Sequence, residues 1–170
     1  MKTVFAAVVL LSATLASSAV GQDDEQARKT LTGLSGVYVI VEQLPDEAQH
    51  DGLREDQVQT DVELRLRQAG ITILTREQSF ATAGAPYLYV NVQVLKNPAK
   101  FYAFSVNVEL RQGVTLIRDP SIRVLAVATW SAPGVIGTVG SQKLESQVRD
   151  DVRDFTDRFI NAYLAANPKR

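Results

Sequence analysis

Residues 87–111 read YLYVNVQVLKNPAKFYAFSVNVELR, and this stretch decides the predicted fold class. In its first half, every second residue from Leu88 to Val94 is aliphatic, with polar or aromatic residues between them. The second half repeats the alternation from Tyr102 to Leu110. This period of two indicates two β-strands, and the short KNPAK segment between them indicates an antiparallel hairpin.

Further strands are predicted on both sides of this hairpin. Residues 35–44 (SGVYVIVEQL) carry apolar side chains on both faces, which is typical of a central strand. Shorter strands are predicted at residues 71–75 (ITILT) and 122–130 (IRVLAVATW). The second strand of the hairpin is expected to continue past a bulge at Gly113.

A long amphipathic helix is predicted from Ser141 to Ala166, with Ser141 as its cap and Pro168 ending it. At 3.6 residues per turn, its apolar side chains fall within an arc of about 100°. They are Leu144, Val148, Val152, Phe155, Phe159, Ala162 and Tyr163.

Residues 54–69 fit two patterns. Val62, Leu64 and Leu66 alternate with charged residues as in a strand. Early acids, late arginines and Gly70 in the position of a C-terminal cap favour a helix instead. We predict a helix over Arg54–Ala69.

These elements, in the order β-α-β-β-β-β-α, predict an α+β fold of the two-layer α/β sandwich type. Both amphipathic helices should cover one face of a mixed sheet, with the first βαβ unit adding a parallel pair. The predicted core is Val39, Val41, Val62, Leu66, Val90, Val92, Val106, Val108, Val148, Val152, Phe155 and Phe159.

The amino-terminal end has the features of a secretory signal peptide over residues 1–21. Lys2 precedes a short apolar run, and small residues follow it. Residues 22–30 are polar and are predicted to form a flexible leader, followed by a single α/β domain over residues 31–167. No Cys is present for lipid attachment, so we expect a periplasmic or secreted protein that does not span the membrane after signal cleavage.

The composition excludes several classes of function. Lys plus Arg total 18 and Asp plus Glu total 19, for a formal net charge of −1. This balance offers no basic surface, so we expect no nucleic-acid partner. With no Cys and one His, disulfides, thiolate sites and multi-His metal sites are excluded. We therefore predict no catalytic residue, no cofactor and no metal.

Three patterns with chemical potential are better explained by structure. His50 beside Asp51 suits a solvated loop. The D-D-x-x-D-x-x-D run over residues 150–157 resembles magnesium motifs, but interleaved arginines favour a salt-bridged helix face, including an Asp154–Arg158 pair. The remaining pattern, an aromatic group that could stack bases or sugars, is expected to pack in the core and across strands. Its members are Tyr87, Tyr89, Phe101 and Tyr102.

Residues 131–140 (SAPGVIGTVG) are predicted to be a flexible loop ahead of the long helix. Three glycines spaced by three could bind an anion at a helix start, but the spacing matches no phosphate-binding fingerprint. Apolar side chains in and beside the loop make it a candidate partner-binding surface. The candidate residues are Trp130, Pro133, Gly134, Val135, Ile136, Gly137 and Gly140.

The order of elements behind a signal peptide resembles that of small exported bacterial α/β domains. The likeness is carried by residues 36–44 (GVYVIVEQL), residues 64–74 (LRLRQAGITIL) and the strand-rich half that follows. Similar domains are the amino-terminal domain of TolB and the periplasmic domains of the curli secretion protein and of the penicillin-binding-protein activator lipoproteins. The resemblance implies a binding or assembly role without catalysis. The chain departs from the lipoproteins in lacking a lipidation cysteine.

We therefore predict an exported, non-enzymatic binding or envelope-assembly module whose partner is a protein of the cell envelope. The contact could run along an exposed sheet edge, where backbone groups suffice, or through the 131–140 loop. The alternative is a small-ligand-binding protein or enzyme with a pocket between sheet and helices. A subunit that oligomerises through its strands is a third interpretation.

Overall fold

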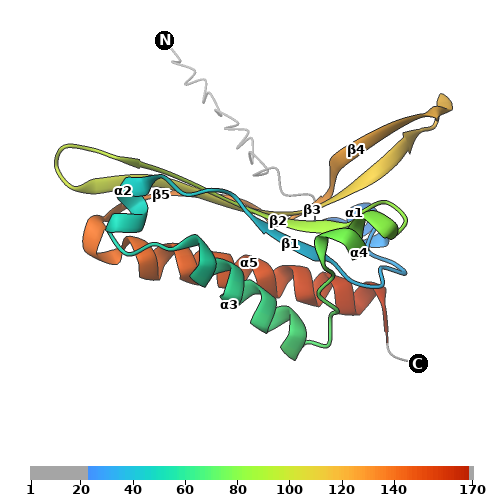
Figure 1. Ribbon diagram of the computed structural model, residues 1–170, viewed down its shortest axis with the longest axis horizontal. Helices are drawn as coiled ribbons and strands as arrows, with labels where there is room; N and C mark the ends of the chain where they lie inside the picture. Colours follow the sequence, from blue (N-terminus) through green and yellow to red (C-terminus); the bar gives the residue numbers. More distant parts are fainter. Residues whose placement is uncertain (1–22, 169–170) are drawn as a thin grey trace, which may run out of the picture.

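The structure is a computed structural model that describes residues 23–168 (Figure 1). Within this range the chain forms one five-stranded sheet, five α-helices and a 3₁₀ turn. The strands are β1 (Tyr38–Val41), β2 (Tyr87–Lys96), β3 (Phe101–Leu116), β4 (Asp119–Ser131) and β5 (Val135–Gly140). The helices are α1 (Glu25–Lys29), α2 (Asp46–His50), α3 (Glu55–Gln68), α4 (Arg76–Ala81) and α5 (Leu144–Ala166), and the turn is η1 (Ser141–Lys143).

The strand β3 is the one on which the sheet is built, because it pairs with three others. One edge of β3, from Tyr102 to Arg111, pairs antiparallel with the whole of β2. The other edge is shared, since β5 pairs with residues 101–106 and β4 with residues 109–116. β1 pairs in parallel with the far side of β2, which gives the order β1-β2-β3-β4.

The helices α3 and α5 lie together on one face of the sheet (Figure 1), which gives the α+β two-layer fold that the sequence predicts. A single cluster of buried apolar residues fills the space between the layers. All twelve predicted core residues belong to it, and none is more than 8% exposed: Val39, Val41, Val62, Leu66, Val90, Val92, Val106, Val108, Val148, Val152, Phe155 and Phe159.

The ambiguous segment 54–69 is helical, as predicted. Val58, Val62 and Leu66 face the sheet at intervals of four residues and are buried. Gly70, with a φ of +80°, ends the helix in the left-handed conformation that glycine adopts at low cost. Burial of one helical face, with arginines left outside, therefore outweighs the alternation that resembles a strand.

The predicted strand over residues 71–75 is largely wrong. Ile73 makes one isolated parallel bridge with Val37, and the parallel partner of β1 is β2. The chain leaves the extended conformation because Thr75 is the N-cap of α4, which begins at Arg76. The Thr75 hydroxyl accepts from the Gln78 amide at 3.2 Å, and the Gln78 side chain accepts from the Thr75 amide at 2.8 Å. This capping box satisfies two amide donors of the helix start.

The segment over residues 131–140 is not a flexible loop, because β5 occupies most of it. Gly137 lies against the Phe104 ring, and a Cβ at this position would come within 2.8 Å of the ring. Glycine is therefore required for close packing here, and it conceals the alternation of the strand. The Ser141 cap is also wrong, since residues 141–143 form η1 and α5 begins at Leu144.

Residues predicted as a flexible leader contribute to the fold. The side chain of Asp24 accepts from the Ala27 amide at 2.8 Å and caps α1, which buries Ala27. Asp23 accepts from the Trp130 indole Nε1 at 2.7 Å and from Arg28 Nε at 2.8 Å. The predicted signal peptide, residues 1–21, lies outside the described residues.

The Asp23 carboxylate provides a pH-dependent test of this attachment. Arg28, and to a lesser degree the Trp130 indole, lower the pKa of this carboxyl against the opposing effect of burial. The folded pKa thus lies below the unfolded value, so its stabilisation is present above about pH 4 and is lost as the pH falls through the folded pKa.

We expect Asp23→Asn to lower the free energy of unfolding by roughly 1 kcal/mol at pH 7, because charge-assisted hydrogen bonds are weakened. Urea unfolding from pH 7 to pH 2 should show the difference from wild type shrinking at the acid end. Asp46→Asn, an exposed carboxyl in α2, is the control. An equal loss in both variants, or a loss unchanged at pH 2, would contradict the attachment.

Candidate functional site

The predicted partner-binding loop does not form one exposed surface. Trp130 is fully buried beneath α5, with its ring centroid 5.3 Å from that of Phe159 in an edge-to-face contact. Ile136, by contrast, is 87% exposed on the outer side of β5. The remaining candidates, Pro133, Gly134, Val135, Gly137 and Gly140, make up the turn before β5 and the strand itself. In this arrangement Trp130 is a core residue with no surface to offer a partner.

The acidic run on α5 forms a salt-bridged face, as predicted. Arg153 contacts Asp150 at 2.7 Å and Asp154 at 3.4 Å, so Asp154 pairs with Arg153 and not with the predicted Arg158. Asp157 pairs with Arg65 across to α3. Among residues 23–168, no group of three or more His, Asp or Glu side chains is placed to hold a metal ion.

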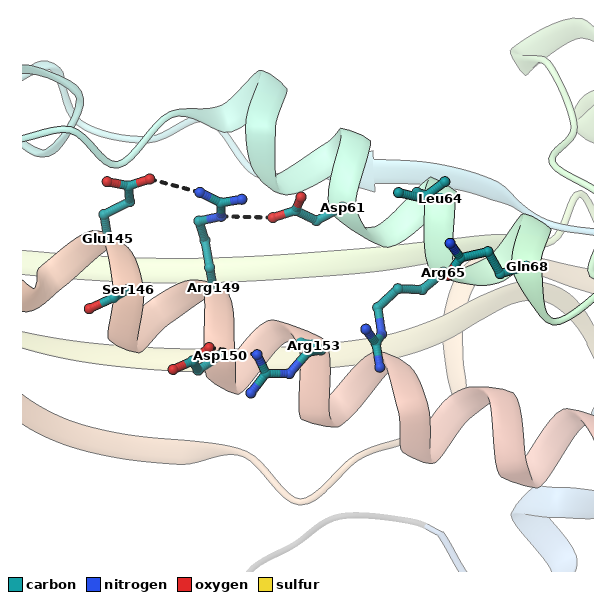
Figure 2. A pocket seen from close by; sticks show the side chains of 9 residues that line it. All are labelled: Asp61, Leu64, Arg65, Gln68, Glu145, Ser146, Arg149, Asp150 and Arg153. Carbon is teal, nitrogen blue, oxygen red and sulfur yellow. Dashed lines mark hydrogen bonds and ion pairs between the residues drawn. The ribbon is translucent and has the colours of Figure 1, made fainter.

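A groove of about 540 Å³ runs between α3 and α5, and Figure 2 shows its lining. Arg149 lies at its centre, 2.7 Å from Asp61 on α3 and 2.8 Å from Glu145 on α5. These two carboxylates raise the pKa of the Arg149 guanidinium. Because the acids and arginines here neutralise one another, we interpret the groove as a structural contact in which ion pairs connect α3 to α5.

His50 is exposed, but it is the last residue of α2 and does not lie in a loop as predicted. Asp51, which follows it, makes structural contacts. The Asp51 carboxylate accepts from Lys96 Nζ at 2.6 Å and from the Tyr102 hydroxyl at 2.9 Å. Lys96 first, and Tyr102 second, lower the pKa of Asp51. These contacts connect the end of α2 to β2 and β3. The Asp51 carboxylate therefore accepts from Lys96 and Tyr102 and does not orient the His50 imidazole.

The predicted aromatic group is divided between the two faces of the sheet. Tyr102 is fully buried on the helix side, as expected for core packing, whereas Phe101 is exposed. Tyr87 and Tyr89 form an edge-to-face pair on the outer face, with centroids 6.3 Å apart. The Arg111 guanidinium lies 4.0 Å from the centroid of the Tyr89 ring. This outer face, which α3 and α5 leave uncovered, is therefore aromatic at one end.

Beyond the helical layer, β3 and β4 extend as a two-stranded ribbon that turns away from the sheet (Figure 1). We call residues 112–127 the β3–β4 arm. Its pairing contains register shifts, which bend and twist a ribbon. Ile117 at the tip is completely exposed and Leu125 is 72% exposed, while Ile122 and Val124 are exposed to a lesser degree. The arm thus presents apolar side chains without a core of its own.

An apolar pocket of about 460 Å³ lies at the foot of the arm, on the outer face of the sheet. We call it the arm pocket. Strand residues from β1 and β2 line it together with α4, the segment after α4, and the foot of the arm. The lining residues are Tyr38, Ile40, Arg76, Ser79, Phe80, Gly84, Ala85, Tyr87, Gly113, Leu125 and Ala126.

Two left-handed alanines line the arm pocket. Ala85 has a φ of +44° and Ala126 a φ of +60°, and Lys100 is the third non-glycine residue with positive φ in the described chain. Such conformations persist only where the surroundings impose them, and they cluster at functional sites. Here the Gly113 amide donates to the Gly84 carbonyl at 2.6 Å, and the Ser79 hydroxyl donates to the Pro86 carbonyl at 3.0 Å.

The comparisons with known proteins leave the site to be interpreted from its own geometry. No family model, no curated protein and no solved structure matches the chain. In residues 23–168, no helix combines the length and apolar character needed to cross a membrane.

Sequence reasoning predicted the two strands of the arm and the irregularity at Gly113, which the register shift between Gln112 and Val114 confirms, but it missed the exposure of the arm and the pocket at its foot. Residues 122–130 are apolar on both faces, which is typical of a buried strand, whereas most of them protrude. Phe80 lies in residues 76–86, a polar segment rich in Ala and Gly for which the pattern predicts only a connection between strands. The useful signal was the capping box T-x-x-Q at Thr75 and Gln78, which predicts the short helix that carries Phe80.

The backbone strain at the arm pocket can be measured by substitution. We expect Ala85→Gly to raise the free energy of unfolding by about 1 kcal/mol, since glycine removes the left-handed penalty. Ala83→Gly, two residues away in the same exposed segment and without a positive φ, should lower it by about 0.5 kcal/mol. Urea unfolding compares the two variants, and a loss of stability in both would show that Ala85 is not strained.

Proposed function

We propose that the chain is an exported, non-enzymatic binding module that holds a protein partner of the cell envelope on its β3–β4 arm. The partner contributes an extended segment in which apolar side chains alternate with acidic ones. The observation that carries this proposal is the exposed apolar surface of the arm, led by Ile117 and Leu125.

The free edge of β4 supports a strand-pairing mode of binding. β4 is the last strand in the order β1-β2-β3-β4, and no described strand pairs with its outer edge. Near its end, Thr30 of the α1 region reaches Thr129 through a hydroxyl–carbonyl hydrogen bond of 3.3 Å. The part of β4 within the arm has no such cover in the described chain. An added strand would supply backbone hydrogen bonds there.

The energetics of a ribbon also favour a bound partner. A two-stranded hairpin is marginally stable in water unless a third strand or a helix covers it. In the arm, Val114 pairs with Val124 and Gln112 with Val127, but the helical layer does not reach this region (Figure 1). A partner strand would bury the apolar side chains and complete a three-stranded unit.

The charge of the arm selects the chemistry of the partner. Arg118 and Arg123 are exposed, and neither is in an ion pair within residues 23–168. Asp119, the acid of the arm, accepts instead from the Ser121 amide and hydroxyl. The arm therefore offers two available cations beside apolar side chains, which suits an acidic extended segment better than a second copy carrying the same arginines.

The interface between sheet and helices favours binding over the alternative of a pocket there. Leu88 and Val108 on the sheet and Phe159 on α5 are fully buried in one apolar cluster. The polar groups that sequence analysis considered for chemistry lie outside this interface, in ion pairs or in solvent.

Site-directed photo-crosslinking tests the proposal. A benzophenone amino acid in place of Ile117 or Ile122 reports on the arm, and the same residue in place of Leu64 on α3, which is half exposed, is the control. After irradiation in an envelope extract of the source organism, we expect a product from the arm positions that the control position does not give.

Mass spectrometry of that product decides the outcome. A synthetic peptide spanning the crosslinked segment should be extended and acidic-apolar. It should bind the purified chain, with its Kd raised about tenfold by Arg118→Gln plus Arg123→Gln. A crosslink to a second copy of this chain would replace the proposal with self-assembly. Products shared with the Leu64 position, or no arm product, would refute it.

A further inference from the structure

We propose that the arm pocket binds a small apolar anion: a carboxylate or sulfonate attached to an aromatic or aliphatic group. This ligand is distinct from the protein partner on the arm, whose contacts centre on the tip and outer edge, and Leu125 borders both surfaces.

The size and lining of the pocket suit such an apolar group. Its volume of about 460 Å³ lies within the range that small-molecule sites occupy. The rings of Tyr38 and Tyr87 from the sheet and of Phe80 from α4 contribute to the lining, with Ile40 and Leu125 adding aliphatic surface. Aromatic side chains at this density favour a flat or branched apolar ligand.

The charge of the lining requires an anion. Arg76 is the one charged residue among the residues that line the pocket, and none of them is Asp or Glu. No carboxylate of residues 23–168 forms a salt bridge with Arg76, whose guanidinium lies 5.8 Å from the Phe80 ring centroid. The exposed Arg76 guanidinium has Glu77 beside it in sequence but forms no salt bridge within the described chain, so it remains available to an anionic group bound against the apolar lining.

The pocket is largely preformed, which lowers the entropic cost of binding. The Thr75–Gln78 capping box holds the start of α4, and the Ser79 hydroxyl ties the helix to the Pro86 carbonyl. The 2.6 Å hydrogen bond from Gly113 to Gly84 joins the arm to the segment after α4. These contacts set the separation between the Phe80 and Leu125 walls before any ligand arrives.

Two fluorescent probes separate the anionic from the apolar part of recognition. Anilinonaphthalene sulfonate carries the anion, and N-phenyl-1-naphthylamine has the same aromatic framework without it. The full chain of 170 residues is expressed, so that any cleavage of its amino-terminal segment can occur. Each Kd is measured by titration. We expect Arg76→Gln to raise the Kd of the sulfonate about tenfold and that of the uncharged probe less than about twofold.

Matched variants complete the test. Arg158→Gln makes the same charge change at an exposed position of α5 and should leave both Kd values unchanged. Phe80→Ser should weaken both probes about fivefold through lost apolar contact. Ile136→Ser, a still more exposed apolar position on β5, should weaken neither.

Three results would overturn the inference: an unchanged sulfonate Kd in Arg76→Gln, an equal effect of Arg158→Gln, or binding insensitive to Phe80→Ser. Circular dichroism establishes that each variant is folded. Because Ile117 and Ile122 lie outside the pocket, crosslinking through the arm can succeed when ligand binding fails, and the reverse also holds.

Discussion

The rest of the structure depends on one constraint: β3 is longer than the part of the sheet that α3 and α5 cover (Figure 1). Its first ten residues present alternating side chains, from Tyr102 to Leu110, to the helical layer, and these are buried. Three strands pair with β3, so it fixes the register of most of the sheet. Where the cover ends, the same strand continues with β4 into the arm. Core and exposed surface are therefore two parts of one continuous strand, β3.

The end of this cover creates two surfaces with different chemistry. The arm combines a free strand edge with exposed apolar and cationic side chains, which suits an extended polypeptide. The arm pocket is bordered by the sheet, α4 and the foot of the arm, and it combines aromatic walls with the single cation Arg76. The hydrogen bond from the Gly113 amide to the Gly84 carbonyl connects the two regions. The left-handed Ala85 and Ala126 lie at this connection, where the chain is under conformational strain.

The sequence predicts those parts of the fold in which one face is buried and the other is solvated. β2 and β3 show this contrast as an alternation of apolar and polar residues, and α5 shows it as an apolar stripe. The same contrast identified all twelve predicted core residues. β5 escaped prediction because Gly137 packs against Phe104 by having no side chain. The strands of the arm were predicted but their exposure was not, because an apolar strand has the same composition whether its neighbours cover it or not. Trp130 was assigned to a surface because its burial depends on Asp23 and Phe159, which are distant in the sequence.

Hydrogen exchange along β3 tests most directly the claim that helical cover ends within this strand. Most of residues 102–110 of β3 have neighbouring strands on both edges, whereas residues 112–116 pair with β4 alone. The comparison therefore uses only amides that donate to a neighbouring strand, which differ chiefly in what packs against their faces. In the purified chain without a partner, the amides of residues 102–110 should exchange slowly. Those of residues 113–116 should exchange about a hundredfold faster, since local opening there exposes little buried surface. Equally slow exchange in both halves of a monomeric chain would contradict the account, because the arm would then have stabilising cover of its own.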